Sequence, residues 1–311
     1  MQILRGRAAA VNQLLISSDS RFLLAGLEFC HVWDLDGPKA KPLTVAVKSE
    51  LNRKVYDAQF LNPTQLLVRT YYPFKRHRYG IETGETIDLA DGLDGICDDI
   101  HIHPSGEFAK VRAVPRPDVL EVWTCRILRH GLAPPDAGTP RPLLGRLRGL
   151  SPAGAHYLVE ATPQDHVRGY HLHDTATDAR VTTFERPRPT GSTVNYVRSW
   201  CFTPDGRSLY FADAERLDRH DCAAGGLPAV VATLSGREYG DSPPLAAHPD
   251  GRVLAVVEDG RAVTFRDADT LEVLRSYDFA MPKVTCVAFT PDGMRCVLGN
   301  SRGKVLLFDI D

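Results

Sequence analysis

The stretch VTCVAFTPDGMRCVLGN, Val284–Asn300, contains two short apolar runs on either side of the tetrapeptide TPDG. Alternating residues precede the tetrapeptide and a short apolar run follows it, which is typical of two antiparallel strands. Between them, proline fixes φ at the second turn position, aspartate tolerates the third, and glycine adopts the left-handed conformation that lets the chain return. Val284–Asn300 is therefore predicted to be a β-hairpin.

The turn signal recurs along the chain at even spacing. FTPDG occurs twice, at Phe202–Gly206 and Phe289–Gly293. Related signals are HPDG, HPSG, SPAG, NPTQ and SSDS, at His248–Gly251, His103–Gly106, Ser151–Gly154, Asn62–Gln65 and Ser17–Ser20. The residue after the proline, or its equivalent, lies at positions 19, 64, 105, 153, 205, 250 and 292, so successive signals are 41 to 52 residues apart. A repeat of this length predicts a β-propeller in which each unit is one four-stranded sheet, a blade.

Further strand patterns follow each hairpin and define how the repeat ends. Third strands are predicted at Cys30–Leu35, Ala262–Asp267 and Lys304–Ile310, and a fourth at Leu271–Phe279. The last unit stops after its third strand, whereas Met1–Arg7, which is similar to that fourth strand, precedes the first unit. We therefore expect an all-β, seven-bladed β-propeller with four-stranded antiparallel blades, in which the N-terminal strand completes the last blade and closes the ring.

The expected organisation is a single domain of residues 1–311. Its blades are expected at approximately residues 8–46, 47–90, 91–145, 146–186, 187–235, 236–280, and 281–311 together with 1–7.

These features resemble the WD40-repeat family in a divergent, bacterial form. The resemblance rests on the seven turn signals and on HVWDLDG (His31–Gly37), with degenerate versions at Phe308–Ile310 and Thr264–Thr270. It covers essentially the whole chain, although the Gly-His pair and most Trp-Asp pairs of that family are missing. The resemblance implies a propeller that acts as a scaffold for protein binding, on a fold that carries many functions.

The composition of the chain indicates which classes of binding partner are disfavoured and in which cellular compartment the protein is expected. The formal net charge of −2 argues against a general nucleic-acid or membrane-surface protein, and no apolar run is long enough to span a membrane. The chain shows no secretory signal, and its seven cysteines lack C-x-x-C spacing, which is typical of reduced thiols in a cytoplasmic protein. An excess of arginine over lysine and abundant alanine favour a GC-rich bacterial source.

Several polar pairs could bind a metal or another cation. These pairs are His101 with His103, His171 with His173, and Asp98 with Asp99. We expect structural roles instead, because His103 occupies the same hairpin-capping position as His248 and the two aspartates fall where a water-lined channel is expected. We therefore expect no metal and no cofactor.

Catalytic motifs are missing from the sequence. There is no G-x-S-x-G elbow, no glycine loop followed by lysine, and no assembly of nucleophile, base and orienting group. Cys286 and Cys296 are expected to be core thiols, with a disulfide as the alternative. We expect a protein that is not an enzyme. The alternative, which a single sequence leaves open, is a lactonase-like bacterial enzyme or small-ligand binder with its site in the central channel.

The segment YYPFKRHRY, Tyr71–Tyr79, combines aromatic and basic side chains without an acidic residue. It is expected to span the connection between the second and third strands of the second blade and the flanks of that connection, on the top face, opposite the Pro-Asp-Gly turns. The equivalent connections of the next two blades, Arg112–Glu121 and Glu160–Gly169, are also long. Tyrosine and arginine are enriched at interface hot spots, and arginine pairs with carboxylates.

We therefore predict a surface on the top face of a monomeric propeller that binds a protein or peptide, with an acidic partner favoured and nucleic acid disfavoured. The alternative is that some of the rings pack beneath the connection while the cations stay solvated. The residues predicted to form the surface are Tyr71, Tyr72, Phe74, Lys75, Arg76, Arg78, Arg112, Arg116 and Arg168.

Overall fold

Strands make up the regular structure of the chain in the ranges that the computed structural model describes. These ranges are residues 1–5, 10–26, 30–37, 42–44, 55–70, 76–88, 97–102, 108–113, 123–129, 141–143, 146–160, 169–177, 179–185, 199–213, 215–234 and 243–310. The prediction of an all-β fold is confirmed. No helix that could cross a membrane occurs in these ranges.

The described residues form seven antiparallel sheets, each of four strands. Sheets 1 to 3 are β2 (Leu14–Ile16), β3 (Phe22–Ala25), β4 (His31–Asp34) and β5 (Leu43–Thr44); β6 (Val55–Asn62), β7 (Gln65–Thr70), β8 (Arg76–Gly80) and β9 (Thr86–Asp88); and β10 (Cys97–Ile102), β11 (Phe108–Ala113), β12 (Trp123–Arg129) and β13 (Arg141–Leu143).

The remaining sheets continue the same order along the chain. Sheets 4 to 6 are β14 (Arg146–Leu150), β15 (His156–Glu160), β16 (Gly169–Asp174) and β17 (Arg180–Glu185); β18 (Ser199–Phe202), β19 (Ser208–Ala212), β20 (Arg216–Asp221) and β21 (Val230–Thr233); and β22 (Leu245–Ala247), β23 (Val253–Glu258), β24 (Ala262–Asp267) and β25 (Val273–Asp278). Sheet 7 is β26 (Val284–Phe289), β27 (Arg295–Asn300), β28 (Lys304–Asp309) and β1 (Gln2–Arg5).

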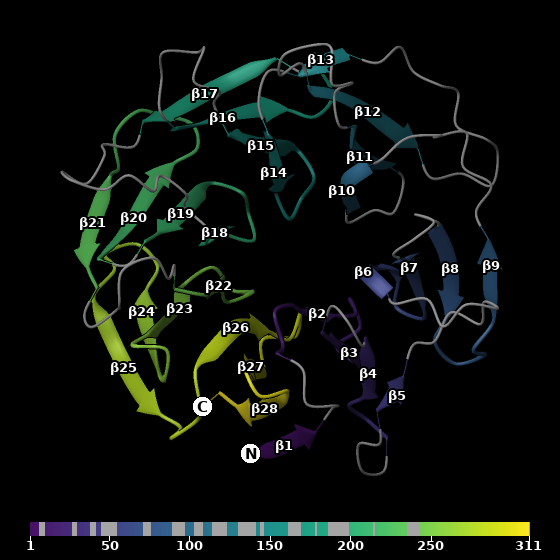
Figure 1. The fold of residues 1–311 in the computed structure, drawn as a ribbon. Coiled ribbons are helices and arrows are strands. Elements are labelled where there is room, and N and C mark those ends of the chain that lie inside the picture. Colours follow the sequence, from purple (N-terminus) through teal and green to yellow (C-terminus); the bar gives the residue numbers. More distant parts are fainter. Residues whose placement is uncertain are drawn as a thin grey trace.

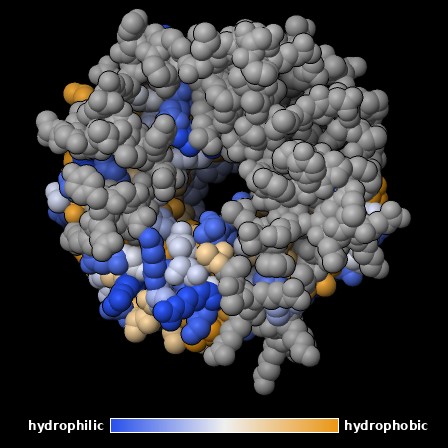
Figure 2. Space-filling view, viewed as in Figure 1, coloured by the Kyte–Doolittle hydropathy of each residue, from blue (hydrophilic) through white to orange (hydrophobic). Residues whose placement is uncertain are grey.

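The seven sheets surround a central opening (Figure 1). The strand nearest the opening is the first strand of each sheet: β2, β6, β10, β14, β18, β22 or β26. The opening is also visible in the space-filling view (Figure 2). Innermost strands of neighbouring sheets contact one another around the ring, with β26 against β2 where the two ends of the chain meet. Such a ring of repeated sheets is compatible with a β-propeller.

Strand β1 joins the last sheet rather than the first. It pairs antiparallel with β28, with Gln2 opposite Leu307 and Arg5 opposite Lys304. The side chain of Leu4 is buried between sheets 7 and 1, in a cluster that includes Trp33 and Leu307. The first and last strands of the described chain are therefore held together by both backbone pairing and apolar packing.

Apolar side chains fill the spaces between neighbouring sheets. Between sheets 1 and 2, for example, Phe22 and Val32 pack against Val68 and Tyr79, and all four are buried. Because both faces of a sheet contact a neighbour, the middle strands read as nearly continuous apolar runs, as in FLLA at Phe22–Ala25, where every residue is buried.

The turn between the first and second strands has a repeated hydrogen-bond design. In sheet 5, the Thr203 hydroxyl donates to the Asp205 carboxylate at 2.6 Å and accepts from the Ser208 backbone N–H at 2.9 Å. The hydrogen bond from Thr203 lowers the pKa of Asp205. Gly206 has φ 71° and Gly293 has φ 73°, the left-handed conformation that the sequence pattern predicted. The first residue of the motif thus fixes the turn, and glycine reverses the chain.

These turns contact each other from sheet to sheet. Gly206 lies against Ser151, Gly251 against Pro204, and His248 Nε2 is 2.9 Å from the Gly293 carbonyl oxygen. The Asp292 N–H donates to the Ser20 hydroxyl at 3.1 Å, which links sheets 7 and 1. The first-to-second-strand turns of these sheets therefore share one end of the ring, here called the turn end. The opposite end, to which the second-to-third-strand connections belong, is called the loop end.

Close approach of β14 to β18 explains a glycine that no turn requires. A Cβ atom added to Gly149 would lie 2.3 Å from Cη2 and 2.7 Å from Cζ2 of Trp200, closer than real contacts allow. We expect Gly149→Ala to destabilise the protein by about 1–3 kcal/mol, because the indole must move out of its packed position. Chemical unfolding followed by tryptophan fluorescence would measure this loss. Gly37→Ala, whose nearest neighbour lies at 3.4 Å, is the control and is expected to change stability by less than about 0.5 kcal/mol.

Candidate functional site

Most of the predicted binding surface lies outside the described residues. Tyr71, Tyr72, Phe74 and Lys75 fall in the connection between β7 and β8, Arg116 in that between β11 and β12, and Arg168 in that between β15 and β16. Arg76 and Arg112 are placed by their backbones, as the first residue of β8 and the fifth of β11. Arg78 is the member of the set whose side chain the structure describes.

The strands that carry the aromatic and basic connection are firmly packed. Val68 and Arg69 of β7 lie opposite His77 and Arg76 of β8, so the two strands stay paired up to the connection. His77 and Tyr79 are buried on the face of β8 that packs against sheet 1, and burial raises the pKa of the Tyr79 hydroxyl. Tyr79 thus belongs to the core, which agrees with the alternative that some of the rings in this segment are buried.

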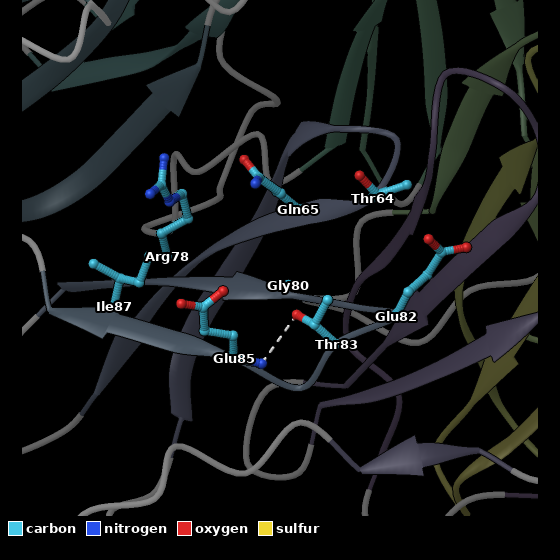
Figure 3. A pocket seen from close by; sticks show the side chains of 8 residues that line it. All are labelled: Thr64, Gln65, Arg78, Gly80, Glu82, Thr83, Glu85 and Ile87. Atoms are coloured by element: carbon cyan, nitrogen blue, oxygen red, sulfur yellow. Dashed lines mark hydrogen bonds between the residues drawn. The ribbon is translucent and has the colours of Figure 1, made fainter.

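Arg78 lies on the opposite face of β8 and lines a shallow, open pocket (Figure 3). The turns of sheet 2 supply most of the other lining residues, with Ile87 from the outer strand; the lining consists of Thr64, Gln65, Arg78, Gly80, Glu82, Thr83, Glu85 and Ile87. The Glu85 N–H donates to the Thr83 hydroxyl at 3.2 Å and holds the turn. Arg78 therefore faces a pocket near the turn end of sheet 2.

The pocket carries both signs of charge and few apolar groups. Glu82 and Glu85 contribute carboxylates and Arg78 contributes a guanidinium. Enclosed small-molecule sites are mostly apolar clefts, so this open and polar hollow is better suited to contact with a polar surface or a solvated ligand. Its described lining residues offer ionic and hydrogen-bonding contacts.

An exposed ion cluster joins sheets 1 and 2 beside this pocket. Arg21 Nη2 is 3.0 Å from Asp34 Oδ2, and Arg21 Nη1 is 2.7 Å from Glu82 Oε1. The hydrogen bond from Arg21 lowers the pKa of Asp34, the aspartate of the Trp-Asp pair. Because these groups are solvated, the two ion pairs add little to the stability of the fold.

The innermost strands present mainly uncharged side chains among those described. Leu15 and Ile16 of β2, Ser199 and Cys201 of β18, and Leu245–Ala247 of β22 are all partly exposed. Arg148 of β14 is the charged residue within the described side chains of these strands, and it pairs with Glu160. Asp98 and Asp99 lie in β10 and His101 lies opposite Lys110, but their side chains are outside the description, as is all of His103.

The histidines that the structure describes have structural partners. His171 is buried in β16, with Nδ1 3.0 Å from the Thr183 hydroxyl, and His173 stacks on Tyr157 with ring centroids 4.9 Å apart. His248 Nδ1 lies 2.8 Å from Asp250 in its turn, which agrees with the predicted capping role. Within the described ranges, no group of three or more His, Cys, Asp or Glu residues is placed to hold a metal ion.

Cys286 and Cys296 are buried thiols and form no disulfide. Their registers explain this, since Cys286 lies opposite Gly299 and Cys296 lies opposite Phe289. Burial raises the pKa of the Cys286 thiol to about 12 and raises that of Cys296 as well. Both groups are therefore protonated at neutral pH and poor nucleophiles.

Comparison of the chain with protein-family models and with curated proteins yields no match.

Proposed function

We propose that the chain is a seven-bladed β-propeller of the WD40 type, closed by β1, and that it acts as a non-catalytic interaction module. In this proposal the loop end of sheets 2 to 4 binds a protein or peptide, with an acidic partner favoured. The surface consists of Tyr71, Tyr72, Phe74, Lys75, Arg76, Arg112, Arg116 and Arg168. Arg78 of the predicted set faces the turn-end pocket and is left out.

The observation that carries the proposal is the position of the strand ends in three consecutive sheets. Strand β7 ends at Thr70 and β8 begins at Arg76; β11 ends at Ala113, and β15 ends at Glu160. Because adjacent strands are antiparallel and sheets 2 and 4 have their first turns at the turn end, the connections that follow these strands belong to the loop end. The aromatic and basic residues gathered in them would then share one rim.

The chemistry of this rim suits a carboxylate-bearing partner. Arginine donates two parallel hydrogen bonds to a carboxylate, and tyrosine buries a large area with little loss of conformational freedom. A ring of packed sheets would hold the rim in place before binding, so little ordering cost would be added. The described innermost side chains are mainly uncharged, with Arg148 paired to Glu160, which favours this outer surface over chemistry in the channel.

The proposal is tested by replacing two rim residues together. We expect Tyr72→Ala with Arg76→Glu to weaken capture of proteins from the native organism, and of an arrayed set of Asp- and Glu-rich peptides, by at least about tenfold. The variant loses an aromatic anchor and places a carboxylate where the partner's carboxylates bind, while its melting temperature stays nearly unchanged. Pull-down would measure the capture of proteins, and fluorescence anisotropy would measure the binding of the peptides.

The matched control is Arg207→Glu, because the Arg207 side chain is 87% exposed and belongs to the turn end. It makes the same change of charge at the opposite end of the ring and is expected to leave capture intact. Capture that survives the double rim substitution but is lost in Arg207→Glu would move the binding surface to the turn end.

A further inference from the structure

Strand β25 is the outer strand of sheet 6 and is exposed along its whole length. All six residues from Val273 to Asp278 are exposed, including Val273 at 55%, Leu274 at 53% and Tyr277 at 41%. Two other outer strands differ: β21 alternates between exposed and partly buried residues, and β17 contains the buried Phe184, which contacts Gly226 of the next sheet. Within the described chain, β25 pairs with β24 alone, so its second edge is open.

The surroundings of this edge are also apolar. Tyr277 stacks on Phe279, whose ring lies 4.7 Å from that of Phe308 in sheet 7. Ile3 of β1 lies opposite Leu306, on the same side of sheet 7 as Phe308, and is 53% exposed. At the lower rim of the molecule, in the region of β25 and β1 in Figure 1, Figure 2 shows a few hydrophobic residues beside strongly hydrophilic ones.

An open edge of this kind normally carries a protective device. Natural sheets prevent edge-to-edge association with charged side chains, especially lysine, with proline, with bulges that twist the edge away, or with very short edge strands. VLRSYD is six residues long and has no lysine or proline; Val273 and Tyr277 are strand-forming residues, and Arg275 and Asp278 are its charged residues. Its one irregularity falls between Val273 and Arg275, near the start of the strand. The remaining residues can accept another strand.

We propose that β25 pairs antiparallel with β25 of a second copy of this chain, about a two-fold axis at Ser276. When two identical strands pair antiparallel at their edges, the two-fold axis that relates them is perpendicular to the sheet. Each residue then lies opposite a residue of the second copy whose side chain is on the same face of the sheet. An axis at Arg275 would set two arginines directly opposite, and one at Asp278 would do the same with two carboxylates, which destabilises a pair of strands. An axis at Tyr277 would pair just Ser276–Asp278 within the strand.

An axis at Ser276 pairs the most residues of the strand without setting like charges opposite each other. Leu274–Asp278 of each copy then pair, with the serines facing each other. Arg275 lies opposite Tyr277 of the second copy, twice by symmetry, and a guanidinium over an aromatic ring is attractive. Just beyond, Val273 lies opposite Phe279 of the second copy. The two four-stranded sheets become one continuous sheet through both copies, on the outer rim and away from the surface proposed above.

The register can be tested by exchanging charges. Tyr277→Lys sets a lysine opposite Arg275 of the second copy, and we expect the dimer to weaken by at least about tenfold in sedimentation velocity at micromolar concentration. Arg275→Asp combined with Tyr277→Lys sets opposite charges face to face twice and is expected to restore the dimer, now in a salt-sensitive form. Val231→Lys, on the half-exposed outer strand β21, is the control and leaves the dimer intact.

A cross-link provides a second readout that does not depend on affinity. Ser276→Cys places two thiols opposite each other at the axis, so mild oxidation is expected to give a disulfide-linked dimer that the parent protein does not form. A parent protein that sediments as a monomer throughout, with no Ser276→Cys cross-link, overturns the proposal. So does a dimer that Tyr277→Lys leaves unchanged. Capture of an acidic partner by the rim is measured separately and stands or falls independently.

Discussion

Replacing Glu258 with leucine is expected to destabilise the protein by about 3–5 kcal/mol, because it leaves a guanidinium buried without its carboxylate. Arg266 Nη2 lies 2.7 Å and Nε lies 3.2 Å from Glu258 Oε1, and the two side chains are 8% and 9% exposed. Arg266 Nη1 also donates to the Leu271 carbonyl at 2.8 Å, which offsets part of the loss. Urea unfolding monitored by circular dichroism would measure the change.

The double variant Glu258→Leu with Arg266→Met separates pairing from packing. Replacing a buried ion pair with apolar residues of similar volume is often close to neutral, so most of the lost stability is expected to return. Glu82→Ala is the matched control, because Glu82 binds Arg21 at the same 2.7 Å but at the surface, and a cost below about 1 kcal/mol is expected. A double variant as unstable as Glu258→Leu would contradict this account.

Replacing Leu4 with alanine is expected to cost about 2–5 kcal/mol, the range for deleting a buried leucine side chain. Leu4 is 1% exposed and packs among apolar residues of both sheets 7 and 1, so the cavity would form where the ends of the chain meet. Thermal unfolding would measure the effect. Ile3→Ala, one position away on the 53% exposed face of the same strand, is the control and is expected to be nearly neutral. Equal losses at the two positions would mean that β1 contributes through its backbone alone.

Local chemistry made the hairpins predictable. The strand predicted at Ala262–Asp267 has those bounds in β24, and the one predicted at Leu271–Phe279 is β25, Val273–Asp278. Proline, aspartate and glycine act within four residues of chain, so their effect is visible in one sequence. Contacts between sheets have no such local signal. The approach of Gly149 to Trp200 joins residues 51 positions apart, and no pattern around either residue indicates it.

The same distinction applies to the candidate site. The sequence predicted that YYPFKRHRY spans the connection after β7 and its flanks, and β7 and β8 have bounds that fit. It did not show that Arg78 faces the turn-end pocket, because that depends on which face of β8 packs against sheet 1. The full exposure of β25 was also not predicted. VLRSYD reads as an ordinary fourth strand, and its exposure depends on neighbours that the sequence does not identify.

The pairing of β1 with β28 has a consequence for how the protein is made. Thr285 Oγ1 donates to the Val11 carbonyl, a contact between residues 274 positions apart, and β1 lies even farther from its partner strand. Contacts of such long range form slowly, because a large loop must close before they stabilise anything. On the ribosome, β1 would emerge long before β28, so a growing chain would keep Leu4 and Trp33 without their final neighbours. Nascent chains should therefore be prone to chaperone binding until synthesis reaches Lys304.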